Sequence, residues 1–232
     1  GATVTFTSGA TVDSQADEHN DLTIDVGTQQ VLFNNDVGGV FPLGVFVITQ
    51  ADTGVIFGES DTDQGPGTTG PVTTIFADGL IDLGVGRNVL DGAVGIVFNA
   101  GTDTLLVMTT DDTVRFNGAV TLRSAVEIDT NFEILTGGGT VRFTSNATID
   151  SEADEFNDLT VDAGIQEVLF NNNLGATQPL GEFTIIQADG GVTFGESDLD
   201  EGPGTIGPVT MIATDGAIDI GVLGNIINGG IL

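Results

Sequence analysis

The first 95 residues of this chain recur 137 positions later without a gap. Residues 1–95 match residues 138–232, and 59 of the 95 paired positions are identical. Surface loops accept insertions at little cost, so tandem copies of ordinary domains drift in length. A gapless match therefore predicts that nearly every position has a fixed structural place. We divide the chain into one full unit, residues 1–137, and a partial second copy, residues 138–232, in a continuous repetitive fold.

The composition is that of a folded chain rather than a disordered one. Hydrophobic residues make up 40% of the 232 residues, which is enough for a substantial core. Glycine accounts for 35 residues, as many tight corners between short strands would require. Cysteine is absent, which excludes disulfides, and no run of about 18 apolar residues encodes a span of a bilayer.

The charge is strongly acidic and restricts the possible partners. Asp and Glu number 34 against 4 Lys and Arg, for a formal net charge of −30. Nucleic acid is excluded as a partner, because phosphate binding needs a basic surface. A charge of this size destabilises a compact fold through self-repulsion unless cations screen it or bind. The sequence therefore predicts divalent cations as partners, with a merely solvated acidic surface as the alternative.

Short β-strands account for most of the sequence. Apolar residues alternate with polar or β-branched ones in brief runs bounded by Gly, Asn or Asp, and no stretch has a convincing helical period. We predict an all-β fold with strands in the first unit at residues 3–7, 22–26, 31–33, 46–48, 55–57, 72–76, 96–98, 105–108, 114–116 and 120–122.

A triplet of a β-branched residue, any residue and phenylalanine recurs along these strands. With Phe76 included as a weaker member, successive phenylalanines lie 18 to 27 residues apart: Phe6, Phe33, Phe57, Phe76, Phe98, Phe116, Phe143, Phe170 and Phe194. This spacing is typical of one coil of a parallel β-helix, in which each coil pairs with the coil before it. We therefore expect the phenylalanines to stack as a ladder inside a solenoid.

Pairs of an aliphatic residue and aspartate indicate a second column. We expect the aliphatic side chain to point inward and the aspartate outward, next to a corner, in Val12-Asp13, Ile24-Asp25, Ile81-Asp82, Ile128-Asp129, Ile149-Asp150, Val161-Asp162 and Ile218-Asp219. The alternative architecture is a string of Ig-like or cadherin-like sandwiches. The absence of Trp and Tyr, and of a Pro-rich boundary, favours the solenoid.

Residues 114–122 and 158–164 resemble the β-strand repeats of giant bacterial surface proteins. These are the filamentous-haemagglutinin-like and autotransporter-passenger-like adhesins, and the resemblance extends over most of the chain through degenerate motifs. It implies a secreted, elongated, right-handed parallel β-helix at the cell surface or outside the cell, used as a stalk, fibre or adhesin. A resemblance of this kind specifies architecture better than activity.

The sequence offers few groups for catalysis. His19 is the single histidine, and the second copy has Phe156 at that position. A Ser or Cys nucleophile needs a base such as His, and a zinc site needs Cys or His ligands. Paired carboxylates could serve a polysaccharide hydrolase or lyase, but the chain lacks the Trp, Tyr and Lys that sugar sites commonly use. We predict that the chain is not an enzyme, with the hydrolase as a remote alternative.

The carboxylates form two groups that recur in both copies. Residues 1–95 contain 13 acids, of which 11 are unchanged in the second copy. The Asp13 cluster consists of Asp13, Asp17 and Asp21, with the counterparts Asp150, Asp154 and Asp158. The Glu59 cluster consists of Glu59, Asp61 and Asp63, with the counterparts Glu196, Asp198 and Asp200.

Both clusters are candidate calcium sites. Ca²⁺ takes six to eight oxygen ligands, and the alternating acids of the Glu59 cluster could direct carboxylates into one concavity, with Gly65 turning the chain. The alternative is an acidic corner that keeps the surface solvated and discourages pairing between neighbouring molecules. We name Ca²⁺ as the predicted ligand.

A structural role accounts best for a long, regular repeat of this kind. We predict a repeat segment of a secreted surface or matrix fibre that assembles with copies of itself, end to end or side by side. The alternative is the stalk of an adhesin that binds through a tip outside these residues. A solenoid has an unpaired strand edge at each end, and such edges favour stacking of another unit.

Overall fold

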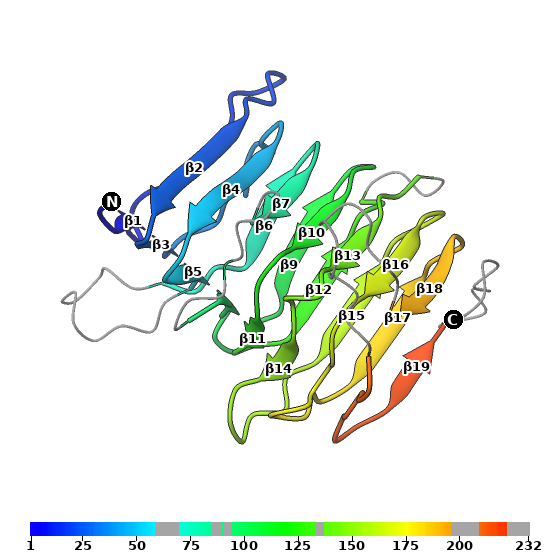
Figure 1. Ribbon diagram of the computed structural model, residues 1–232. Coiled ribbons are helices and arrows are strands. Elements are labelled where there is room, and N and C mark those ends of the chain that lie inside the picture. The colour runs from blue at the N-terminus through cyan, green and yellow to red at the C-terminus, as the bar shows by residue number, and fades with distance from the viewer. Residues whose placement is uncertain (59–69, 85–89, 91–93, 133–136, 196–208, 222–232) are drawn as a thin grey trace.

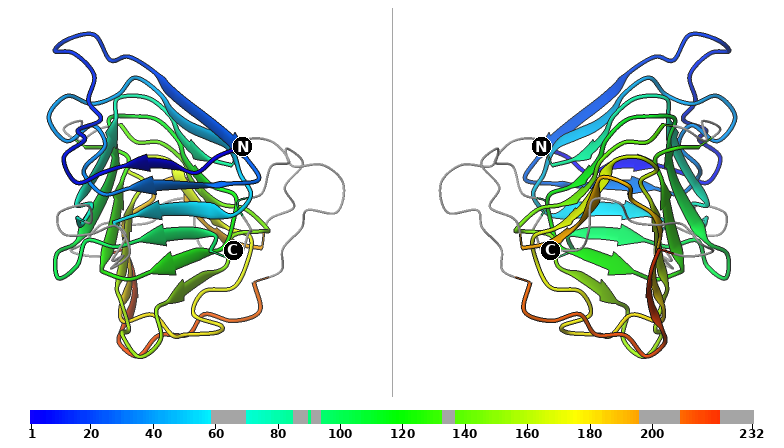
Figure 2. Two further views of the ribbon diagram at one scale, coloured as in Figure 1. Left: turned by 90° about the vertical axis from the view of Figure 1, so that its left-hand side faces the viewer. Right: turned by 90° about the vertical axis from the view of Figure 1, so that its right-hand side faces the viewer.

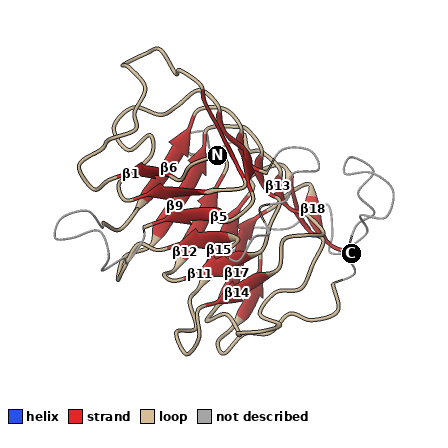
Figure 3. Cartoon of the chain, turned by 60° about the vertical axis from the view of Figure 1, so that its left-hand side comes forward, coloured by secondary structure: helices blue, strands red, loops and turns tan. Residues whose placement is uncertain are grey.

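We describe the fold from a computed structural model, which places residues 1–58, 70–84, 90, 94–132, 137–195 and 209–221. Strands and loops make up this part of the chain, and it contains no helix (Figure 3). The all-β prediction is therefore confirmed for the described residues. Successive coils advance along one axis from β1 to β19 (Figure 1).

The strands form three parallel sheets. Sheet A has the order β1 (Val4–Phe6), β3 (Gln30–Phe33), β5 (Gly54–Phe57), β8 (Ile96–Phe98), β11 (Val120–Leu122) and β14 (Ile149–Ser151). Sheet B has the order β6 (Thr74–Ala77), β9 (Leu105–Thr109), β12 (Val126–Asp129), β15 (Leu159–Asp162), β17 (Phe183–Gln187) and β19 (Ile218–Ile220). Sheet C has the order β2 (Leu22–Gly27), β4 (Phe46–Ala51), β7 (Ile81–Leu83), β10 (Val114–Phe116), β13 (Val141–Phe143), β16 (Glu167–Phe170) and β18 (Gly191–Phe194).

The chain visits the three sheets in a fixed rotation, from A to B to C. Where no named strand is present, an isolated parallel bridge takes its place: Val12 and Val37 extend sheet B, and Leu174 and Ile212 extend sheet A. Figure 2 shows the strands of sheet A stacked as parallel arrows along the axis. The chain is thus a parallel β-helix, as predicted, and antiparallel sandwiches are excluded for the described strands.

Alternation separates the core from the surface in strands such as β10 and β13, whereas every residue of β5, β7 and β8 is buried. In β10, Val114 and Phe116 are buried inside the solenoid, whereas Arg115 points to the outside. The same pattern repeats in β13, which pairs with β10 in register. Apart from a small separate cluster of Leu32, Ile56 and Val97 in sheet A, one continuous hydrophobic core runs through both copies of the unit. Its continuity follows from the pairing, because each inward residue contacts its counterpart in the next coil.

The phenylalanines form two stacks rather than the single ladder expected from their spacing. Phe6, Phe33, Phe57 and Phe98 stack in sheet A, and Phe116, Phe143, Phe170 and Phe194 stack in sheet C. Phe98 and Phe116 meet edge to face, with ring centroids 5.8 Å apart, and join the two stacks. Offset and edge-to-face contacts of this kind are the favourable geometries for aromatic pairs.

The change of face explains the shortest phenylalanine spacing. The 18 residues from Phe98 to Phe116 carry the chain only two-thirds of a coil, from β8 in sheet A to β10 in sheet C. Phe76 is not a member of either stack: it is partly exposed and packs edge to face on Phe132, with centroids 5.3 Å apart. The spacings from Phe57 to Phe76 and from Phe76 to Phe98 therefore do not each correspond to one coil between stacked phenylalanines.

The aliphatic–aspartate pairs also belong to more than one column. Ile81 lies in sheet C, Ile128 in sheet B and Ile149 in sheet A, and all three are buried as expected. The following aspartates face outward, although Asp82 is only 9% exposed. The direction of each pair was predictable from alternation, but the expectation of a single shared column was wrong.

Phe116 tests the aromatic core because it joins the two stacks. Phe116→Ala removes a fully buried ring that contacts both Phe98 and Phe143. We expect the free energy of unfolding, measured by urea denaturation, to fall by about 3–5 kcal/mol. Phe41→Ala is the matched control, because Phe41 is 41% exposed, and we expect it to change stability by less than about 1 kcal/mol. Equal losses in the two variants would contradict the aromatic core.

Candidate functional site

The Asp13 cluster lies at a corner between sheets and bonds to the next coil. Asp13 Oδ1 accepts a hydrogen bond from the Val40 amide at 2.9 Å, and Asp21 Oδ1 accepts one from the Val45 amide at 2.9 Å. The second copy repeats both bonds. Asp150 Oδ1 accepts from the Thr177 amide at 2.7 Å, and Asp158 Oδ1 accepts from the Glu182 amide at 2.6 Å. These carboxylates therefore satisfy backbone donors of the neighbouring coil.

The tip of the same loop has an unusual backbone conformation in both copies. Asp17 and His19 have positive φ angles of 64° and 50°, and their counterparts Asp154 and Phe156 have 66° and 52°. Asp tolerates this left-handed region better than most residues. All four side chains are exposed. The loop therefore keeps one conformation whether its second left-handed position is His or Phe.

These contacts give Asp13 and Asp21 a structural reason to recur in both copies. Their role in calcium binding stays a prediction. Among the described residues, no three His, Cys, Asp or Glu side chains are grouped closely enough to hold a metal ion. The six acids of the Glu59 cluster, Glu59, Asp61, Asp63, Glu196, Asp198 and Asp200, lie outside the described residues.

Asp36 fastens one coil to the next, a role that the sequence analysis missed. Its Oδ1 accepts hydrogen bonds from the amides of Thr73 at 2.7 Å and Thr74 at 3.0 Å. In the second copy Asn173 replaces Asp36, and its Oδ1 accepts from the amides of Thr210 at 2.7 Å and Met211 at 3.0 Å. An amide oxygen thus replaces a carboxylate oxygen, which shows that this position needs an acceptor rather than a charge.

The exchange between the copies gives a direct test. Asp36→Asn keeps the Oδ1 acceptor, so we expect the free energy of unfolding to change by less than about 0.5 kcal/mol. Asp36→Ala leaves two partly buried amides without their acceptor, and we expect a loss of about 1–3 kcal/mol. Urea denaturation of both variants checks the expectation. A loss in Asp36→Asn as large as that in Asp36→Ala would show that the negative charge matters instead.

His19 contacts an aspartate on the surface. Its Nδ1 lies 3.0 Å from Asp78 Oδ2, and the Thr110 hydroxyl donates to Asp78 Oδ1 at 2.8 Å. The hydrogen bond with His19 holds the pKa of Asp78 below its usual value. The hydroxyl of Thr110 therefore bonds to the aspartate and not to the imidazole. This arrangement lacks the nucleophile-to-base bond of a catalytic triad.

A partly buried ion pair lies on the outer face of sheet C. Arg115 Nη1 is 3.0 Å from Asp82 Oδ1 and donates to the Gly84 carbonyl at 2.6 Å. Burial raises the pKa of Asp82, and the Arg115 guanidinium offsets part of that effect. Arg142 occupies the position next to Arg115 in the following strand. Two of the four basic residues are thus adjacent, on a surface where acids greatly outnumber bases.

Two aspartates are paired side by side on sheet B. Asp129 at the end of β12 is the register partner of Asp162 at the end of β15. The backbone amide of Asn131 donates to Asp129 Oδ1 at 2.9 Å, and its side-chain Nδ2 donates to Asp162 Oδ1 at 3.2 Å. Burial raises the pKa of Asp129 to about 6, and the Asp162 carboxylate adds to the effect. Burial also raises the pKa of Asp162.

The raised pKa of Asp129 makes stability depend on pH in a definite direction. The folded state binds this proton more tightly than the unfolded state, in which the pKa is near 3.8. The stabilising contribution is therefore complete below about pH 4 and is lost as the pH rises through about 6. A shift of two pKa units corresponds to about 3 kcal/mol, which the partial exposure of Asp129 reduces to about 1–2 kcal/mol.

Asp129→Asn isolates this effect because asparagine keeps the Oδ1 acceptor for Asn131. We expect the variant to be more stable than the parent protein by about 1–2 kcal/mol at pH 7, and equally stable near pH 4. Asp25→Asn is the control, since Asp25 is the first-copy counterpart of Asp162 but pairs with Gln50 instead of a second carboxylate. Urea denaturation at the two pH values measures both. A stability gain for Asp129→Asn that is the same at both would refute the assignment.

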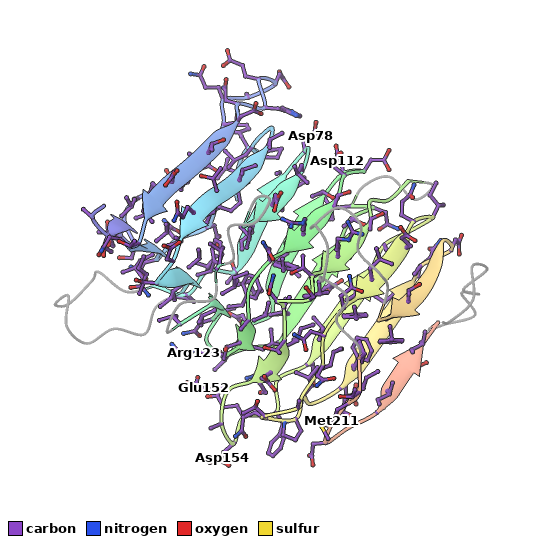
Figure 4. The ribbon with its side chains drawn as sticks, viewed as in Figure 1. Asp78, Asp112, Arg123, Glu152, Asp154 and Met211 are labelled. Atoms are coloured by element: carbon purple, nitrogen blue, oxygen red, sulfur yellow. The ribbon has the colours of Figure 1, made fainter. Side chains whose placement is uncertain are left out.

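Charged residues lie along more than one edge of the solenoid. Asp78 and Asp112 lie along the edge between sheets B and C, whereas Arg123, Glu152 and Asp154 lie along the edge between sheets A and B (Figure 4). Arg123 Nε and Glu152 Oε2 are 3.2 Å apart. Within the described residues, acids therefore occur on separate edges. They contact backbone amides, arginines, and polar side chains such as His19 and Thr110.

Comparison with known proteins gives no relative for this chain. No family model, no curated protein and no solved structure matches it. The described part of the chain has no helix with the length and hydrophobicity needed to cross a bilayer.

Proposed function

We propose that this chain is a structural repeat segment of an extended surface or extracellular-matrix fibre. The observation that supports the proposal most directly is the continuity of the solenoid through the junction of the two copies. Strand β13, which opens the second copy, pairs in register with β10 of the first, and Phe143 stacks on Phe116 with centroids 4.8 Å apart. A unit that adds to its predecessor by ordinary β pairing can extend a fibre without a new type of interface.

Strand edges at the ends of the solenoid support association with further copies. Ile218 in β19 is 50% exposed, whereas its first-copy counterpart Ile81 is fully buried beneath β10. Among the described residues, a further coil therefore covers this sequence position in the first copy, and none covers it in the second. Unpaired parallel edges with apolar inward residues favour the addition of another strand. The partner that fits this edge is a coil of the same repeat.

We also propose that the chain does not act as an enzyme. The His19 position tolerates Phe156 with nearly the same backbone conformation, so the imidazole is not required by the loop. Two carboxylates of the Asp13 cluster, Asp13 and Asp21, accept hydrogen bonds from backbone amides. A structural role accounts for these contacts, whereas a hydrolase would need an acid and a base directed at a shared substrate.

The cell exterior is the proposed location, and divalent cations are the proposed partners of the acidic surface. A formal net charge of −30 is carried by a chain with only four basic residues. Monovalent salt screens charges only beyond about 8–10 Å at physiological ionic strength. Calcium bound to closely spaced carboxylates would relieve the remaining repulsion, and extracellular fluids supply it at high concentration.

Sedimentation and electron microscopy together test the fibre proposal. We expect the weight-average mass in analytical ultracentrifugation to rise with protein concentration, and micrographs to show rods longer than one molecule. Association through strand edges predicts that Ile218→Lys reduces the mass increase, because a charge at an inward position opposes pairing. Ile165→Lys, at a residue that is 47% exposed on a turn, is the control. Single short rods at every concentration would favour the adhesin stalk over the self-assembling fibre.

Thermal unfolding tests the proposed cations. We expect the Tm in millimolar CaCl₂ to exceed the Tm in EDTA at the same ionic strength, because a ligand of the native state stabilises it by mass action. Ionic strength is held constant with NaCl so that screening does not account for the difference. Replacing Glu59, Asp61 and Asp63 by their amides should reduce the shift if the Glu59 cluster binds the ion. The same Tm with and without calcium would leave only a solvated acidic surface.

A further inference from the structure

The two copies of the unit occupy different faces of the solenoid. Strand β1 lies in sheet A, but its counterpart 137 residues later, β13, lies in sheet C. Likewise β2 lies in sheet C and its counterpart β15 lies in sheet B. The same displacement holds for β3 and β16, β4 and β17, β5 and β18, and β7 and β19. The repeat of the sequence is therefore not a whole number of coils.

Counting strand positions gives the size of the displacement. Residues 1–95 supply nine positions, from β1 to β7 with the bridges at Val12 and Val37, and these make three whole coils. Residues 96–137 supply five more, from β8 to β12. One unit therefore spans fourteen positions, or four and two-thirds coils. The rotation between copies arises entirely from residues 96–137, whose five positions fall one short of two coils.

We propose that tandem units of this sequence form a fibre with threefold screw symmetry. Each unit turns the next by two-thirds of a coil, so three units return to the starting face after fourteen coils. With about 4.8 Å between paired strands, one unit advances about 22 Å and the full period is about 67 Å. The proposal rests on the proposed function only in assuming that the units are arranged in tandem.

The junction already shows that this rotation is compatible with the core. Val114, Arg115 and Phe116 of β10 pair with the identical triplet of β13, although the two strands come from different parts of the unit. The Phe column consequently leaves sheet A at Phe98 and continues in sheet C at Phe116. Residues 96–137 therefore act as an adaptor: they carry the aromatic column from one face to another before the unit begins again.

The rotation distributes equivalent surface loops over the edges of the solenoid. The loop of residues 13–21 leaves the edge between sheets B and C, next to β2, whereas residues 150–158 leave the edge between sheets A and B (Figures 1 and 4). A third unit places the loop on the edge between sheets C and A. The fibre thus presents the same acidic loop in three directions 120° apart. Neighbouring fibres can then meet through equivalent surfaces on all three edges, which suits a bundle of copies rather than a flat ribbon.

Distances between spin labels on the full chain test the rotation directly. Glu18 and Glu155 are exposed counterparts in the two copies, and the screw places them on different edges, four and two-thirds coils apart. Glu18 and Ile165 are not counterparts, but both leave the edge between sheets B and C, five coils apart. The variants are the double substitutions Glu18→Cys/Glu155→Cys and Glu18→Cys/Ile165→Cys, each labelled and measured by pulsed electron paramagnetic resonance.

The order of the two distances decides between rotation and translation. With the screw, the Glu18–Glu155 distance exceeds the Glu18–Ile165 distance, because the first pair is separated across the solenoid as well as along it. If units repeated by simple translation, each would span four or five whole coils, the Glu18–Glu155 distance would be about 19–24 Å, and the order would reverse. That reversal would overturn the threefold screw. A monomeric chain that gives the expected order would retain the screw while contradicting self-association, so the two proposals fail separately.

Discussion

Parallel pairing between consecutive coils is the constraint on which the rest of this molecule depends. Each strand forms hydrogen bonds with the strand one coil before it and one coil after it, so an inward residue has the same neighbours whatever the coil length. Phe33, for example, stacks on Phe6 and Phe57, at 4.7 Å and 4.9 Å between centroids. Insertions within a strand would break this stacking, whereas a change of corner leaves it intact. The pairing therefore accounts for the absence of gaps within the strands, whereas corner contacts such as that of Asp13 with the Val40 amide fix positions between them.

The same constraint explains how a chain with so many acids can have a well-satisfied surface. A parallel solenoid leaves backbone amides at each corner where one sheet ends and the next begins. Asp13, Asp21 and Asp36 accept hydrogen bonds from these amides, in each case from the following coil. Asn173 does so equally well in place of an aspartate. Some of the carboxylates therefore form hydrogen bonds between coils. Others, such as Asp129 and Asp162, destabilise the fold through burial and mutual repulsion when they are ionised.

The sequence was sufficient for the fold class and for most strands of the first unit, because alternation and the recurring phenylalanine are local signals. The strands Ile81–Leu83 and Val126–Asp129 were not among those predicted. Strands at Ile96–Phe98, Val114–Phe116 and Val120–Leu122 lie where the pattern predicts them. The face of each strand was not predictable, since a count of residues does not reveal how many corners the chain turns between two phenylalanines. The pairing of Asp129 with Asp162 depends on that same register. An aspartate that caps a backbone amide also looks, in sequence, the same as one that binds calcium.

The two copies therefore share their local structure but not their position around the solenoid axis. Sheet C continues from Ile48 and Leu83 in the first copy to Phe116 and Phe143 at the junction, so one column of the core changes from aliphatic to aromatic without losing its pairing. Strands of nearly the same sequence fit different faces, as β1 does in sheet A and β13 in sheet C. A unit whose strands fit any of the three faces can be duplicated without regard to the number of coils that it spans. The threefold screw follows from that tolerance, and requires no dedicated contact between units.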